Sequence, residues 1–258
     1  MVTFAALGAQ LTCAGSKSSA APEPRRVERF QALAAEMSAE AQSLRWKLKI
    51  RGIELAILTL ESQPVRYSDG VEHLVSTVQS SGVGGWFKTV ARRTVTVAVG
   101  GVPVSAWAHK QEQDKWWRLY TRFNRNAVSV VVDRDDKSRL VKRATKLGDV
   151  ILNGETALAA LRRWRPAPGE IRTGVSLAET RMWWMHFRSA GNEAIEIDDR
   201  QFVAHRIEGE LWRLSENGEI ERDRQPRKVT LWIDTGPKRL PLRFDADTKF
   251  GSVSAELD

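Results

Sequence analysis

The chain has 258 residues and a net charge of +8, with 42% hydrophobic and 28% charged residues. This length and composition suit one large globular domain or two small ones with a real hydrophobic core. The single cysteine, Cys13, excludes an intramolecular disulfide, and no apolar run reaches the roughly 18–20 residues that a membrane-spanning helix needs. The basic balance suits an anionic partner, such as a nucleic acid, a lipid headgroup or an acidic polysaccharide, or a solvated basic surface.

The N-terminal segment has two interpretations. Residues 1–12 are mildly apolar, and Cys13 separates them from a linker of small and polar residues, 14–24. This arrangement is typical of a bacterial lipoprotein signal, in which Cys13 is the acylated first residue of the mature protein. No Lys or Arg precedes the apolar run, as a secretory signal requires. The alternative is therefore a disordered tail with an inert cysteine. We assign residues 1–24 to this signal-like or disordered segment and residues 25–258 to a single β-rich domain.

The domain begins with a helical pattern that changes into a strand-like one. Apolar residues recur at spacings of three and four over residues 25–37, which predicts a short amphipathic helix. Over residues 44–51 apolar residues alternate with Lys and Arg, which predicts a half-buried strand with a basic outer face.

Further strands are predicted where apolar or β-branched residues recur between turn signals. They cover 53–60, 71–79, 93–99, 115–123, 127–132, 181–188, 193–197, 201–208, 210–214, 227–234 and a closing pair within 240–257.

One element interrupts the β pattern. Asn153 and Gly154 form an N-cap signal, and Leu158, Leu161 and Trp164 follow at helical spacing before prolines 166 and 168 end the pattern. The sequence therefore predicts a helix over about residues 154–164. The whole chain is predicted to be mainly β (α+β): a curved antiparallel sheet or half-barrel with one or two short helices, and with this helix on its concave side.

Three segments carry a resemblance to a known family. They are residues 44–60 with Gly52-Ile53, residues 154–169 with Leu-Arg-Arg-Trp-Arg-Pro-Ala-Pro-Gly, and the Trp strand, Leu-Pro, Arg strand and Phe-Gly-Ser-Val of residues 227–257. In order and spacing they resemble the Domain of Unknown Function 3108 family of exported bacterial proteins, over about residues 40–258. The resemblance implies a secreted or lipid-anchored envelope protein. It also implies a curved sheet similar to lipoprotein carriers of the LolA and LolB kind, which hold acyl chains in a half-barrel. It assigns no functional residues.

No catalytic, cofactor or metal site can be built from the spacing of the residues. The four histidines are far apart in sequence, although His186 and His205 lie in predicted strands and could approach each other. The carboxylates near Asp198 and Asp199 are interpreted as a hairpin turn, with acid/base or Ca²⁺ chemistry as the alternative. The pairs Trp116-Trp117 and Trp183-Trp184 lie in predicted strands. One Trp of each pair is therefore expected in the core and the other outside or in a groove.

These observations favour a non-catalytic carrier or binding module for an acyl chain or another amphiphile, in the periplasm or at the outer membrane. The alternatives are a tethered envelope interaction protein without a small ligand and a carbohydrate binder that uses exposed Trp side chains. Nucleic acid is not an expected partner, because alternation places Trp46 on the face opposite Arg45, Lys47, Lys49 and Arg51. We expect no enzyme activity and no cofactor, a membrane association only through an acylated Cys13, and lipid or envelope proteins as partners.

Overall fold

A computed structural model describes residues 42–50, 52–64, 70–80, 90–113, 115–134, 137–148, 150–248 and 251–258. The predicted helix over residues 25–37, the linker and Cys13 lie outside these described residues.

Fifteen strands form one sheet, in the order β8-β7-β6-β5-β4-β3-β2-β1-β15-β14-β13-β12-β11-β10-β9. Neighbouring strands are antiparallel, except β9 and β10, which are parallel. The strands are β1 (Gln42–Ile50), β2 (Ile53–Pro64), β3 (Val71–Ser80), β4 (Val90–Val99), β5 (Val102–Glu112), β6 (Lys115–Asn124), β7 (Ala127–Arg134), β8 (Lys137–Ala144), β9 (Ile151–Asn153), β10 (Ile171–Ala178), β11 (Arg181–Ile197), β12 (Arg200–Arg213), β13 (Arg227–Asp234), β14 (Pro241–Thr248) and β15 (Gly251–Leu257).

The first and last strands meet in the middle of the sheet, where β1 pairs with both β2 and β15. The inner face of β1 is apolar, and Trp46 is fully buried, with its indole Nε1 donating a 2.7 Å hydrogen bond to the carbonyl of Pro241. The predicted basic outer face is largely neutralised by β15 and the C-terminal residue. Lys49 pairs with Glu256 at 2.5 Å, and Lys47 pairs with Asp258 at 2.6 Å.

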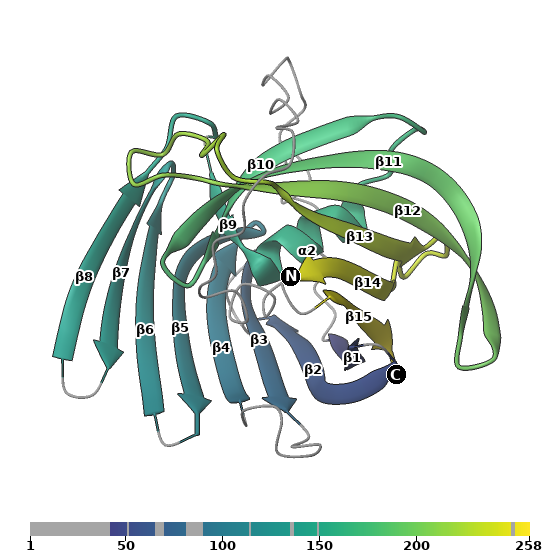
Figure 1. Ribbon diagram of the computed structural model, residues 1–258, viewed down its shortest axis with the longest axis horizontal. Helices are drawn as coiled ribbons and strands as arrows, with labels where there is room; N and C mark the ends of the chain where they lie inside the picture. The colour runs from purple at the N-terminus through teal and green to yellow at the C-terminus, as the bar shows by residue number, and fades with distance from the viewer. Residues whose placement is uncertain are drawn as a thin grey trace.

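The sheet curls around the helix α2 (Gly154–Arg163), so that α2 lies in its concavity (Figure 1). Leu158, Leu161 and Trp164 are buried in a core cluster with inward residues of both halves of the sheet. The helix begins as the sequence predicts, because the Asn153 side chain accepts a 3.1 Å hydrogen bond from the Thr156 amide. The prediction of a mainly β, single curved sheet with a helix on its concave side is confirmed.

The two edges of the sheet, β8 and β9, do not pair with each other; β9 lies against β5 and the turn between β6 and β7. A second core cluster combines inward residues of β5–β8, such as Leu119 and Val130, with residues of β9–β12, such as Trp184 and Trp212. In the segment after β8, the Thr145 amide donates a hydrogen bond to the Asn126 carbonyl, and the Ile151 amide donates one to that of Arg125. Packing rather than a continuous hydrogen-bonded ladder therefore closes the curved sheet.

Several predicted boundaries differ from the structure. Residues 181–197 form one strand, because Gly191 adopts a positive φ of 96° at a bulge instead of ending the strand. Residues 200–213 are also one strand, in which Gly209 leaves room for the Phe187 ring. The strands β5, β8, β9 and β10 were not predicted.

Candidate functional site

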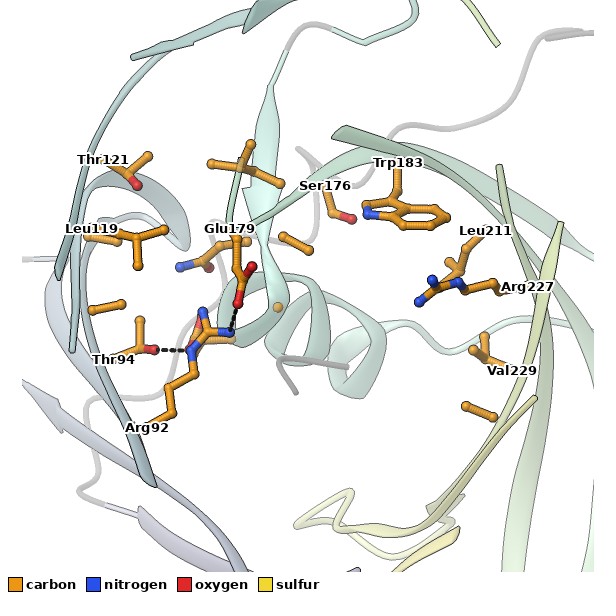
Figure 2. Close-up of a pocket in the computed structure, with 18 of the residues that line it drawn as sticks. Arg92, Thr94, Leu119, Thr121, Ser176, Glu179, Trp183, Leu211, Arg227 and Val229 are labelled. Atoms are coloured by element: carbon orange, nitrogen blue, oxygen red, sulfur yellow. Dashed lines mark hydrogen bonds and ion pairs between the residues drawn. The ribbon is translucent and has the colours of Figure 1, made fainter. Parts of the chain in front are cut away.

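A cavity lies between the two halves of the curled sheet, beside the N-terminus of α2 (Figure 2). Its volume is about 910 Å³, counted together with the part that opens to solvent. Its walls come from β4–β6 on one side, β10–β14 on the other and the first turn of α2. Apolar side chains on its walls include Leu119, Phe123, Leu177, Trp183, Leu211 and Val229. The cavity is therefore a mainly apolar recess between the two sheet halves that opens to solvent.

The wall formed by β4 and β5 carries a buried charge cluster. Arg92 and Lys110 are each 8% exposed, and each lies 3.6 Å from the Glu179 carboxylate, which belongs to the turn between β10 and β11. Arg92 Nε also donates a 3.2 Å hydrogen bond to the Thr94 hydroxyl. Lys110 also lies 3.7 Å from the Glu112 carboxylate, so two cations and two carboxylates balance in this cluster, which joins the two halves of the sheet across the cavity.

The opposite wall carries a second guanidinium group. Arg227 lies over the Trp183 ring, with 4.7 Å between the guanidinium carbon and the ring centroid, and Figure 2 shows both beside Leu211. Burial lowers the pKa of Arg227, and the like charges of Arg181 and Arg213 lower it further. An anionic group bound at this wall would offset both effects, because it would stabilise the charged form of Arg227.

The N-terminal end of α2 is attached to the inner face of β3 and β4 by buried polar contacts. Ser76 donates a 2.6 Å hydrogen bond to Glu155, and the Asn153 amide group donates a 2.5 Å hydrogen bond to Thr96. A smaller hollow of about 350 Å³ lies farther along the helix and shares Val229 with the cavity. The helix thus borders both hollows on the side that faces β13 and β14.

Sequence reasoning missed the cavity residues Arg92, Glu179 and Arg227, and Lys110 in the charge cluster beside them. A signal for two of them exists in the strand pattern. Arg92 has the same inward parity as Thr94 and Thr96, and Lys110 has the parity of Ala106 and Ala108. A charged residue at an inward position of a strand indicates a polar wall rather than a packed core.

The residues considered for metal or acid/base chemistry do not form such a site. His205 is buried and hydrogen-bonded to Ser189 and Asn192, and its partner position on β11 is six residues from His186, about 20 Å along the strand. The described residues contain no group of three or more His, Cys, Asp or Glu side chains placed to hold a metal ion. Asp198 and Asp199 form the turn between β11 and β12, as predicted, and both have positive φ.

The Trp pairs divide between two faces of the sheet, as expected: Trp184 lies in the core and Trp183 lines the cavity, while Trp117 packs on the core and Trp116 faces outward. Trp183 and Trp184 are both buried, at 7% and 0% exposure, because the two faces of β11 contribute to two different core clusters. Trp116 and Trp117 are both half-buried, and cationic side chains cover their rings. Within the described part of the chain no Trp side chain is exposed, so the carbohydrate alternative loses the observation on which it depended.

Two predictions concern membrane attachment. Lipid attachment at Cys13 stays a prediction, because this residue lies outside the described ranges. Of the helices that can be described, none is long and apolar enough to cross a membrane.

Comparison with known proteins gives a family and a shared fold. The family model described as "Protein of unknown function (DUF3108)" matches residues 43–258. No curated protein sequence matches the chain. Among solved structures, the chain is similar to a β-barrel-like protein of the domain of unknown function DUF1849 from Brucella abortus. The two share 8% sequence identity with a TM-score of 0.55, over 86% of this chain and 97% of that chain. At this identity the likeness shows the fold alone.

Two further solved structures match over most of their length with lower TM-scores. One is a protein with a YmcC-like fold from Bacteroides fragilis, with a TM-score of 0.32, 8% identity, and coverage of 83% of this chain and 92% of that chain. The other is the lipoprotein LppX of Mycobacterium tuberculosis, with a TM-score of 0.25, 14% identity, and coverage of 89% and 93%. Neither superposition is close enough to bear on the site.

Proposed function

The chain belongs to the DUF3108 family, whose function is unknown, and we propose that it is a non-catalytic binding or carrier protein that holds the acyl chain of an amphiphile in its cavity. The observation that carries this proposal is the cavity between the two sheet halves, whose mainly apolar walls also carry Arg92, Arg227 and three carboxylates, those of Glu155, Glu179 and Asp247. Burial of an acyl chain there would contribute about 0.8 kcal/mol per methylene group.

Arg227 is the basis for proposing an anionic headgroup, because Arg92 is ion-paired with Glu179, and the carboxylates of Glu155 and Asp247 also line the cavity. Arg227 lies at the cavity wall near Arg181 and Arg213, and Arg92 lies at the opposite wall beside Lys110. A carboxylate or phosphate accepts charge-assisted hydrogen bonds from guanidinium groups, which an uncharged headgroup cannot replace. The proposal extends to a place in the bacterial periplasm or at the outer membrane, with Cys13 as the tether, as the N-terminal pattern predicts.

A titration of the delipidated protein with fatty acids of increasing length tests the proposal, with a fluorescent fatty acid as the displaced probe. We expect saturable binding in which each added methylene group strengthens affinity about fourfold until the cavity is full. Beyond that length the affinity should stay constant.

A pair of matched variants locates the binding. Ala108 lies on the cavity wall and is buried, whereas Ala91 lies on the outer face of the neighbouring strand and is exposed. Ala108→Phe should fill the cavity and weaken fatty-acid binding at least tenfold, while Ala91→Phe should leave it unchanged. Near-ultraviolet circular dichroism would verify that both variants fold. Absence of saturable uptake would leave an interaction protein without a small ligand as the better description. Equal binding by both variants would place the fatty acid outside the cavity and contradict the proposal.

A further inference from the structure

The outer face of the sheet carries an apolar row across six strands. Residues that face away from the cavity on β3–β8 are in register with one another, and each pairs with the next. This row, here called the outer stripe, consists of Val75, Val95, Trp107, Tyr120, Val131 and Leu140. At the usual spacing between strands it is about 24 Å long.

Part of the outer stripe is open to solvent. Tyr120 is 43% exposed and Leu140 is 55% exposed. Trp116 lies on the same face, under the guanidinium of Arg118 at 4.9 Å. A continuous apolar row with aromatic side chains on the outside of a sheet indicates an interaction surface rather than a chance exposure.

Basic residues flank the outer stripe on both sides. The register places Arg93 and Arg118 in the row on one side, and Arg122 and Lys142 in the row on the other. All four side chains are exposed, and none has an ion-pair partner among the residues that the structure describes. The acidic residue in these rows of β3–β8 is Asp133, which accepts a hydrogen bond from Ser138.

We propose that the outer stripe docks the protein on the surface of a bilayer that contains anionic lipids. Aliphatic and aromatic side chains would enter the boundary between headgroups and acyl chains, where the amphipathic rings of Trp and Tyr are favoured. The flanking cations would contact the anionic headgroups, each contributing to affinity. A nucleic acid would use the cations and aromatic rings, but it offers no apolar medium for Val95, Val131 and Leu140. This inference is independent of the cavity, because it rests on the opposite face of the sheet.

The test is co-sedimentation of the full chain with vesicles of phosphatidylcholine, with and without phosphatidylglycerol. Every protein in the experiment carries Cys13→Ser, so that an acyl anchor cannot contribute. We expect binding to the anionic vesicles, little binding to pure phosphatidylcholine, and weakening at high salt, because salt screens exposed charges.

Two double variants and their matched controls identify the surface. Arg118→Gln with Arg122→Gln should weaken binding by about tenfold or more. The control combines Arg188→Gln with Arg200→Gln. It removes the same charge from the other half of the sheet and should leave vesicle binding unchanged. The double variant Tyr120→Ser with Leu140→Ser should also weaken vesicle binding. Its control, Ile171→Ser with Val203→Ser, removes exposed apolar residues elsewhere and should leave vesicle binding unchanged.

Three outcomes would overturn the inference: no binding to anionic vesicles, equal weakening by test and control variants, or binding of a single-stranded oligonucleotide in place of vesicles. Ala108→Phe separates this result from the cavity proposal, because it should block fatty-acid uptake and leave vesicle binding unchanged.

Discussion

At the scale of single residues, the proposed function predicts that Arg227 selects the headgroup of the ligand. Its guanidinium is held between the Trp183 ring and the like charges of Arg181 and Arg213. We expect Arg227→Gln to weaken the binding of a fatty acid about tenfold or more, because hydrogen bonds to charged groups contribute roughly 1.5–3 kcal/mol. Binding of the fatty alcohol of equal length should be unaffected. The ratio of the two dissociation constants measures this effect.

Arg200→Gln, at the exposed start of β12, is the control and should preserve the preference for the acid. If Arg227→Gln weakens the binding of the acid and of the alcohol equally, Arg227 packs against the ligand without interacting with its charge.

A second residue, His205, links stability to pH. Burial lowers its pKa, Arg239 lowers it further, and its ring is hydrogen-bonded to Ser189 and Asn192. The unfolded chain therefore binds the proton more readily than the folded protein does. The contribution of neutral His205 to stability is complete above the ordinary histidine pKa of about 6.5 and is lost as the pH falls below it.

We expect the free energy of unfolding, from urea titrations at pH 7.5 and 5.5, to fall less with pH in His205→Gln than in the original protein. His73→Gln, at an exposed position of β3, should keep the original pH dependence. If the free energy of unfolding of His205→Gln falls as much between pH 7.5 and 5.5 as that of the original protein, this account of His205 is wrong.

At the scale of elements, the turn after β12 is attached to the end of β8. Gly218 has a φ of 79°, Thr145 donates a hydrogen bond to its carbonyl, and a Cβ atom on it would lie 2.1 Å from the Ala144 carbonyl oxygen. Gly52 has the same φ of 79°, but a Cβ there would meet no atom within 4 Å. The two glycines therefore share backbone strain and differ in available space.

We expect Gly52→Ala to lower the free energy of unfolding by about 1 kcal/mol, from the backbone alone. Gly218→Ala should cost at least about 2 kcal/mol more, because the turn must move away from β8. Urea unfolding of both variants measures the difference. Similar costs would show that this contact does not help to close the sheet.

The elements that the sequence predicts well are those with a packed inner face. In β1 the alternation is clear because every inward residue from Leu44 to Ile50 is apolar. In β5 the inward residues Ala106, Ala108 and Lys110 face the cavity or its charge cluster, so the alternation is weak and the strand was missed. The edge strand β8 was missed because solvent contacts both of its faces, which leaves it rich in charged residues.

At the scale of the whole molecule, the sequence predicts a curved antiparallel sheet with an internal helix, and the structure confirms this. It could not predict how the edges meet, because Leu119 and Val130 contact Trp184 and Trp212 across large sequence separations without any local signal. The cavity depends on that closure, since Arg92 and Arg227 reach its opposite walls from β4 and β13. The candidate site is therefore a property of the closed sheet.

The central claim is that the cavity holds an acyl chain, and native mass spectrometry tests it most directly. The protein would be purified without organic solvent from its own host and measured intact and after delipidation, beside Ala108→Phe prepared in the same way. We predict an additional mass that corresponds to a fatty acid or an anionic lipid, which is lost on delipidation and absent from Ala108→Phe. A bare polypeptide mass in both proteins, or an equal adduct on both, would contradict the account.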